Sequence, residues 1–261
     1  MTDHPLHITR KGGILEVVLD VPKANAISAA TSRKMGEAFA AFRDDADLRV
    51  AIITGAGEKF FSAGWDLKGA AAGEPPDADY GVGGFAGLQE LPNLNKPVIA
   101  ALNGMAVGGG FELALSADMI IAAEHVRFAL PELKAGTLAD AATIKLPRRM
   151  PYHVAMDLLL TGRWMDAAEA HRWGLVNEIV PAVDLLTRAR ALAALLADGP
   201  PLVFAAIKEV ARETEGMPFP QAMRRIMQRG FPTVATLYAS ADQLEGAKAF
   251  AEKRAPVWRG R

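Results

Sequence analysis

Two glutamates and one run of glycines are the residues of this sequence best suited to chemistry. Segment 107–115 reads Val-Gly-Gly-Gly-Phe-Glu-Leu-Ala-Leu, so three glycines open an apolar, helix-forming run that carries one carboxylate, Glu112. An unpaired carboxylate is costly to bury, and burial raises its pKa. Glu112 therefore needs a partner, a cavity or a bound proton, and each of these indicates a polar site in an apolar wall.

The glycines leave backbone N–H groups bare at the start of the predicted helix. Such groups bind anions, either a phosphate or a carbonyl oxygen that gains charge in a transition state. The run lacks the Lys-Ser or Lys-Thr of a P-loop and fits no Gly-x-Gly-x-x-Gly frame, so it matches neither phosphate motif. Close helix packing is the alternative reason for three glycines.

A second carboxylate, Glu132, follows Pro131, which we expect to end a short strand running through Phe128. Glu112 likewise comes after a predicted strand that ends at Leu102. The carboxyl ends of parallel strands line ligand crevices, so the two glutamates form a candidate acid and base pair. As a single residue, Glu132 would be read as a solvated loop carboxylate.

Segment 60–67, Phe-Phe-Ser-Ala-Gly-Trp-Asp-Leu, follows a third predicted strand. A turn at Ala63 and Gly64 would offer a further N–H group for the same oxygen. Asp66 is placed to cap a following helix.

These residues must be positioned by an α/β fold. Apolar runs at 14–20, 50–54 and 97–102 predict strands, and helical spacing predicts a helix over 28–42. This order favours parallel pairing. Segment 69–84 has no periodicity and predicts a long surface loop. Further helices are predicted over 154–160, 167–173, 185–196, 202–214, 221–228 and 241–253.

The composition excludes several classes of function. The chain has 261 residues, is 51% hydrophobic, and carries 29 Lys and Arg against 30 Asp and Glu, so no basic field exists for nucleic acid or an anionic membrane. It contains no cysteine, and the polar first ten residues show no secretory core. The five histidines show no metal-ligand spacing. We expect a cytoplasmic protein with no metal.

Taken together, these motifs resemble the crotonase superfamily, the family of enoyl-CoA hydratases and isomerases. The resemblance runs nearly end to end, through segments 22–26, 62–67, 96–104, 108–114, 131–132, 161–163 and 250–254. It implies a spiral of ββα units over residues 1–197 and a C-terminal helical region, 198–261, that assembles homotrimers, often paired as hexamers. It implies acyl-CoA thioester substrates and no separate cofactor, with coenzyme A as part of the substrate.

By the same resemblance, Ala63 and Gly109 supply the N–H groups of an oxyanion hole, and Glu112 and Glu132 handle water at Cβ and the proton at Cα. An isomerase of the family needs only one carboxylate, so isomerisation remains an alternative. The substrate-binding positions that the resemblance implies are Lys23, Ala24, Ala26, Gly64, Trp65, Asp66, Leu67, Lys68, Tyr80, Phe85, Gly110, Asp140, Phe250 and Lys253, the last of these often acting across a subunit boundary.

Segments 55–67, 76–79, 83–88 and 247–261 are similar to a branch of the family whose substrates carry a trimethylammonium group. Such a group favours aromatic faces. Trp65, Tyr80 and Phe85, in or beside the predicted loop, are candidates for these faces, and ordinary packing is the alternative.

Segment 136–146 departs from the family pattern. Ala139 stands where the family has proline, a glycine pair is missing, and the segment is one residue short. In family hydratases the N–H group at the position of Asp140 helps to hold the catalytic water. The change leaves three outcomes open: a normal hydratase, altered chemistry, or weakened catalysis with acyl-CoA binding retained.

Overall fold

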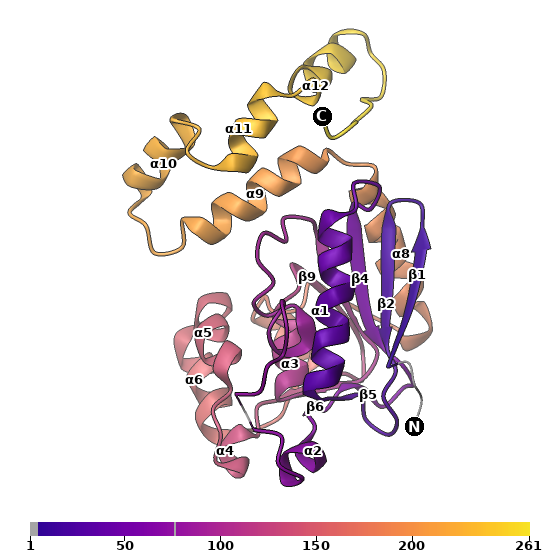
Figure 1. Cartoon of the computed structure of the whole chain (residues 1–261), viewed down its shortest axis with the longest axis vertical. Helices are drawn as coiled ribbons and strands as arrows, with labels where there is room; N and C mark the ends of the chain where they lie inside the picture. Colours follow the sequence, from indigo (N-terminus) through magenta and orange to yellow (C-terminus); the bar gives the residue numbers. More distant parts are fainter. Residues whose placement is uncertain (1–4, 76) are drawn as a thin grey trace.

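The computed structural model describes residues 5–75 and 77–261. Pro76, part of segment 76–79, lies outside the described residues, and so do residues 1–4 of the polar N-terminal stretch. Figure 1 shows an α/β body with the last helices of the chain at one end of the molecule.

The large sheet has the order β1-β2-β4-β7-β9-β12. β1 pairs with β2 antiparallel, and every other neighbouring pair is parallel. Every residue of β4 and β7 is buried, as expected for the continuous apolar strands of a covered parallel sheet. The three predicted strands are confirmed. The bounds are β1 (Leu6–Lys11), β2 (Ile14–Leu19), β4 (Val50–Gly55), β7 (Val98–Leu102), β9 (Met119–Ala123) and β12 (Glu178–Val180).

A smaller sheet has the order β11-β10-β8-β5, in which β5, β8 and β10 run parallel. Its strands are β5 (Phe60–Ser62), β8 (Met105–Val107), β10 (Arg127–Ala129) and β11 (Met165–Asp166), and a separate pair joins β3 (Ala26–Ile27) to β6 (Gly64–Trp65). The chain passes three times from the large sheet to the small one, from β4 to β5, β7 to β8 and β9 to β10. This repetition agrees with the predicted ββα spiral.

One expectation about the strands is wrong. Glu112 does not follow the strand that ends at Leu102, because β8 lies between them. The strand that precedes each glutamate therefore belongs to the small sheet: β8 leads to Glu112, and β10, the predicted strand through Phe128, leads to Glu132.

Helices cover the sheets. α1 (Ala29–Asp44) is capped by Ser28, whose hydroxyl accepts from Thr31 N, and it buries Met35, Phe39 and Phe42 at helical spacing. α8 (Leu185–Ala197) packs on β4, β7 and β9. The shorter helices of the body are α2 (Leu67–Ala71), η1 (Phe85–Gly87), α3 (Gly109–Ala114), α4 (Glu132–Ala135), α5 (Asp140–Arg149), α6 (Tyr152–Thr161), α7 (Ala167–Arg172) and η2 (Ala182–Asp184).

The last helices form an arm at the upper end of Figure 1, with a small core of their own around Ala206, Phe231 and Val234. They are α9 (Pro201–Glu213), α10 (Phe219–Met227), α11 (Pro232–Ala239) and α12 (Asp242–Ala251). The predicted helices are confirmed, and α5 and α11 were missed. In the described parts of the chain, no single helix has the length and apolarity to cross a membrane, although Ala182–Ala197 and Pro201–Glu213 meet both criteria as a pair bent by 102°.

Candidate active site

The three parallel strands of the small sheet end at one edge, and the candidate residues follow them there. β5 leads to Gly64 and Trp65, β8 leads to the glycines of segment 108–110, and β10 leads to Glu132. This edge is where open parallel sheets bind ligands.

The turn after β5 packs directly on the first residues of α3. A Cβ atom on Gly64 would lie 2.6 Å from Gly109 N, and one on Gly110 would lie 2.2 Å from Ser62 O. No side chain fits at either place, which is why both are glycine. Within the described residues, Gly109 N and Gly110 N have no hydrogen-bond partner, as expected for the first turn of a helix.

The prediction that Ala63 supplies the second oxyanion donor is wrong. Its N–H group is occupied, because it donates to Ala24 O at 2.9 Å where the chain pairs with the strand that contains Ala26. Asp66 N also donates to β3, to Ile27 O at 3.0 Å. Neighbouring N–H groups of a strand point to opposite sides, so the Trp65 N–H group, next to that of Asp66, faces away from β3. Trp65, and not Ala63, has the donor for this role.

Glu112 is 7% exposed and has two donors. Ala142 N donates to its Oε1 at 2.9 Å, and Gln89 Nε2 donates to its Oε2 at 3.2 Å. Burial raises the pKa of the Glu112 carboxyl, whereas these two hydrogen bonds oppose the rise. The predicted buried carboxylate is therefore held in place by groups from two other segments.

Glu132 is less well satisfied. Its Oε1 lies beside Gly108, where a Cβ atom would come within 2.7 Å of it, and its buried Oε2 has no hydrogen-bond partner. Burial raises the pKa of Glu132 to about 7; its own backbone N–H group opposes the rise, and the charges of Glu112 and Asp140 add to it. At neutral pH this carboxyl is close to half protonated, as an acid or base catalyst should be.

Aromatic rings lie against the start of α3. A Cβ atom on Gly109 would come within 2.4 Å of Phe85 Cε1, and the Tyr80 ring meets the Phe85 ring edge to face at 5.4 Å between centroids. Burial raises the pKa of Tyr80, and so do the nearby charges of Glu74, Asp77 and Asp140. This aromatic pair thus has a negatively charged border.

The altered segment leads into α5, and the first turn of this helix contacts Glu112. α5 begins at Asp140, and its third residue, Ala142, makes the hydrogen bond to Glu112. The Asp140 side chain is exposed, and its charge acts on Glu112, Glu132 and Tyr80.

The other predicted residues fall into two groups. Lys23, Ala24, Leu67 and Lys68 lie near the β3–β6 pair or in α2, and Asp66 caps α2 by accepting from Lys68 N at 3.1 Å. Phe250, which is 86% exposed, and Lys253 lie at α12, at the opposite end of the molecule from α2 and α4 in Figure 1. Within one chain, the structure does not bring this second group to the glutamates.

Sequence reasoning missed Gln89 and Ala142, the two partners of Glu112. Neither belongs to a motif, since Gln89 lies in an irregular segment and Ala142 acts through its backbone. The polar pair Gln89-Glu90 between Leu88 and Leu91 was the one available signal.

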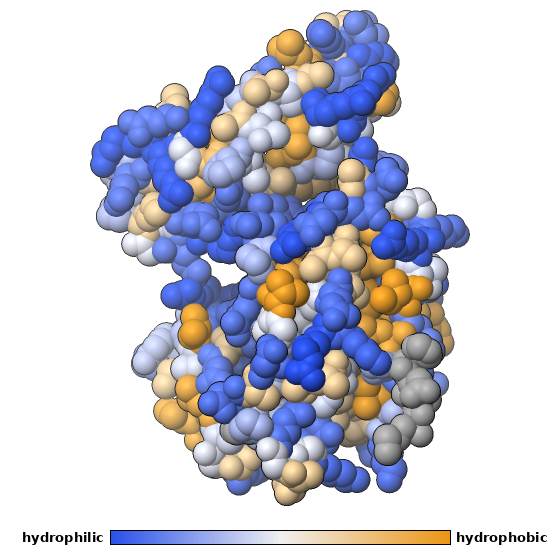
Figure 2. All heavy atoms as spheres, viewed as in Figure 1, coloured by the Kyte–Doolittle hydropathy of each residue, from blue (hydrophilic) through white to orange (hydrophobic). Residues whose placement is uncertain are grey.

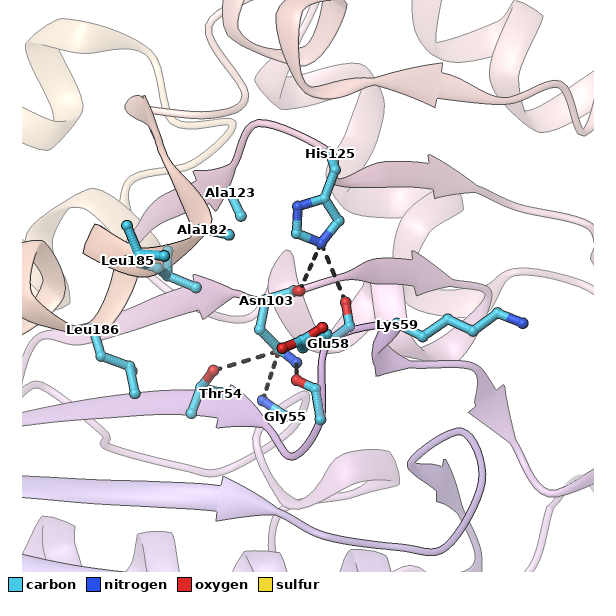
Figure 3. Close-up of a pocket in the computed structure, with 12 residues that line it drawn as sticks. Thr54, Gly55, Glu58, Lys59, Asn103, Ala123, His125, Ala182, Leu185 and Leu186 are labelled. Carbon is cyan, nitrogen blue, oxygen red and sulfur yellow. Dashed lines mark hydrogen bonds between the residues drawn. The ribbon is translucent and has the colours of Figure 1, made fainter.

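A separate cavity of about 760 Å³ lies at the carboxyl ends of β4, β7 and β9 (Figure 3). Asn103 Oδ1 accepts from Gly55 N at 3.0 Å, and His125 Nε2 lies 3.1 Å from Asn103 O. No predicted site residue lines this cavity. Among the described residues, no group of three or more His, Asp or Glu is placed to hold a metal ion.

Comparison with known proteins agrees with this geometry. The family described as enoyl-CoA hydratase/isomerase matches residues 9–261. Carnitinyl-CoA dehydratases from Salmonella typhi and from Escherichia coli K12 are 57% and 56% identical over 257 residues, which is 98% of this chain and 98% of each relative.

The fold is also that of solved enoyl-CoA hydratases. The enzyme from Mycobacterium tuberculosis H37Rv superposes with a TM-score of 0.89 at 38% identity, over 98% of this chain and 99% of that one. The enzyme from Bacillus anthracis gives a TM-score of 0.89 at 31% identity, over 99% and 100%. The chain therefore belongs to the enoyl-CoA hydratase/isomerase family, the crotonase superfamily.

Proposed function

We propose that this protein adds water to, and removes it from, an acyl-CoA thioester, with crotonobetainyl-CoA and carnitinyl-CoA as the substrate pair. The names of its relatives support this acyl group. The observation that carries the proposal is the buried, unpartnered Glu132 Oε2 beside the glycine turn, within electrostatic range of a second buried glutamate. Two carboxylates favour a hydratase over an isomerase.

In the hydration direction, Glu112 begins as the carboxylate and Glu132 as the acid. Glu112 takes a proton from water as the water oxygen bonds to Cβ, and the electrons of the double bond move to the thioester oxygen. Trp65 N–H and Gly109 N–H stabilise the resulting enolate, which then takes the Glu132 proton at Cα. Dehydration reverses each step, so that Glu132 removes the Cα proton and Glu112 protonates the leaving hydroxyl.

This mechanism predicts a specific pH dependence. Both directions use the state in which the two glutamates share one proton, so kcat/KM should have the same bell shape for hydration and dehydration. Because the pKa of Glu132 is raised to about 7, activity should be lost as pH rises through about 7. Initial rates measured from pH 5 to 9 in both directions test this, and a rate that stays constant from pH 6 to 9 would contradict it.

We further propose that the aromatic pair and its negative border receive the trimethylammonium group. Tyr80 and Phe85 offer aromatic faces, and the charges of Glu74, Asp77 and Asp140 act on the Tyr80 hydroxyl group. A cation gains from both, since ring faces and carboxylates attract it.

Tyr80→Leu should therefore lower kcat/KM for crotonobetainyl-CoA by about 3- to 30-fold, the range expected for one cation–π contact. Crotonyl-CoA, which has no cation, should be affected much less. The matched control is Tyr152→Leu, because Tyr152 is an exposed tyrosine on α6. Equal losses on both substrates would show that Tyr80 does not recognise the cation.

The coenzyme A part and the assembly are also proposals. Phe250 and Lys253 lie at the far end from the glutamates, so we propose that they contact coenzyme A bound to a neighbouring copy in a homotrimer or hexamer, while Lys23 and Lys68 act in the same copy. Exposed apolar residues support such packing, and Figure 2 shows hydrophobic side chains among the polar ones of the C-terminal arm.

We propose a cytoplasmic enzyme, without metal or separate cofactor, that binds neither nucleic acid nor membrane.

One assay tests the function. Purified protein is incubated with crotonobetainyl-CoA, crotonyl-CoA and 3-hexenoyl-CoA, and hydration and isomerisation are followed by mass spectrometry and absorbance. We expect hydration, fastest with crotonobetainyl-CoA. Isomerisation of 3-hexenoyl-CoA alone would identify an isomerase, and binding of all three without turnover would refute the enzyme assignment.

A further inference from the structure

α5 contacts α3 through three residues on one face. Ala142, Lys145 and Arg149 are spaced three and four positions apart, the spacing of neighbours along a helix face. Figure 1 shows α5 beside α3, the helix that carries Glu112 and begins with the oxyanion glycines.

Each of these residues reaches a different part of α3 or of its end. Ala142 N donates to the Glu112 carboxylate at 2.9 Å. Lys145 Nζ donates to Ser116 Oγ at 3.0 Å, and Ser116 Oγ in turn donates to Glu112 O at 2.9 Å. Arg149 Nη1 donates to Leu115 O. Two cations therefore lie at the C-terminal end of α3, where the helix dipole favours positive charge.

Lys145 differs from Arg149 in the charge that it faces. The ammonium group of Lys145 lies within electrostatic range of Glu112, whereas the carboxylates that act on Arg149 are Asp118 and Glu215. Burial lowers the pKa of Lys145 to about 8; Arg149 lowers it further, while Glu112 and Glu90 oppose the shift. Lys145 therefore carries its charge at neutral pH, and an opposite charge favours the ionised form of a carboxyl. The charge of Asp140, at the start of the same helix, acts on Glu112 in the opposite sense and raises its pKa.

A cavity of about 680 Å³ lies beside this contact, and neither carboxylate in its lining, Asp118 or Glu215, forms an ion pair with Lys145. Its lining includes Gln89 and Ser116, which both bond to Glu112, together with Lys145 and Arg149. These two carboxylates pair with other residues, Asp118 with Lys208 at 2.7 Å and Glu215 with Arg148 at 2.8 Å. Lys145 has a hydroxyl as its hydrogen-bond partner instead of a carboxylate.

We propose that Lys145 is the positioning residue of the acid and base pair, which holds the Glu112 end of α3 through Ser116 and favours the ionised form of Glu112. It acts through Glu112 and does not touch the substrate. This role gives the altered segment a function: α5 holds the catalytic helix with Ala142 and Lys145 although the family's glycine pair is missing. The inference rests on the proposed function, because it assigns Glu112 the role of a base.

The test compares Lys145→Met, Lys145→Arg and Arg149→Met in the intact protein. Lys145→Met removes the charge, so the pKa of Glu112 should rise, and the lower midpoint of the kcat/KM profile should move to higher pH with a loss of about 10-fold in kcat near pH 7, for one misplaced hydrogen-bonded group. Lys145→Arg keeps the charge and should restore this midpoint. Arg149→Met removes an anchor of the same helix end, and it should lower the melting temperature without moving the midpoints.

A readout that needs no turnover separates this inference from the proposed function. Carbon-13 NMR of glutamate-labelled protein follows the titration of Glu112, assigned with Glu112→Gln. We expect the Glu112 titration to move upward in Lys145→Met even if no substrate is turned over. If Lys145→Met does not fold, Ser116→Ala, which removes only the hydroxyl link, should lower kcat and leave KM unchanged. An unmoved Glu112 titration in a folded Lys145→Met, or wild-type kcat in Ser116→Ala, overturns the proposal.

Discussion

Glu132→Gln should lower kcat for crotonobetainyl-CoA hydration by about 10³-fold, within the range for losing a positioned acid or base. KM should change little, because Glu132 touches the substrate only where a proton moves. The amide has nearly the shape of the carboxyl and cannot give a proton to Cα. Progress curves at saturating substrate measure the effect.

The same substitution should not destabilise the protein. Glu132 Oε2 is buried without a partner and its pKa is raised, so ionisation of this carboxyl above pH 7 lowers the free energy of unfolding. Glutamine carries no charge to bury, and we expect the melting temperature at pH 8 to be equal or higher. Glu124→Gln, at an exposed glutamate between β9 and β10, is the matched control and should leave kcat unchanged. Turnover of Glu132→Gln within tenfold of wild type would remove Glu132 from the mechanism.

Glu112 and Glu132 could be selected from the sequence because each lies in an apolar stretch, Glu112 after a glycine run and Glu132 after a predicted strand. The family resemblance assigned their different roles, and the residue pattern alone does not distinguish them. The two donors to Glu112 come from residues 23 and 30 positions away, while Glu132 Oε2 receives none. Which carboxyl holds the shared proton thus depends on tertiary contacts that local patterns do not encode.

The choice of the oxyanion donor also depends on tertiary contacts that the sequence does not reveal. Segment 60–67 identified a turn that packs on the start of α3, yet Ala63 and Trp65 differ in availability because the chain next to β3 uses the Ala63 N–H group. β3 has two residues and β5 and β8 have three each, too short for any periodicity to reveal. In contrast, β4 and β7 are long buried strands, and their apolar runs located them correctly.

The departure in segment 136–146 looks different once its contacts are known. The sequence shows missing glycines and a deletion, and both suggest a displaced N–H group. In the structure a ten-residue helix begins at Asp140, and Ala142 N still reaches Glu112. The N–H group that bonds to Glu112 therefore comes from a regular helix start, which alanine supplies as well as glycine does.

Gly64→Ala should have the second large effect, a loss of about 10²- to 10³-fold in kcat, as found when one oxyanion donor is removed. Gly64 has φ +81°, and a Cβ atom there would lie 2.6 Å from both Gly109 N and Val107 O. The new methyl group must push the Trp65 turn away from the start of α3, so the two N–H groups can no longer meet one oxygen. Rates with crotonobetainyl-CoA and binding of its hydrated product measure the loss.

The strain of a left-handed alanine has to be separated from the collision, and Gly57→Ala does this. Gly57 has φ +79°, nearly the value at Gly64, but a Cβ atom there meets nothing within 4 Å. The left-handed backbone conformation destabilises both variants by about 1–2 kcal/mol. Only Gly64→Ala also places a methyl group between the two N–H donors. We therefore expect similar losses of melting temperature from the backbone term and a large loss of kcat in Gly64→Ala alone. Equal kcat in the two variants would mean that the Gly64 and Gly109 turns do not form the oxyanion hole.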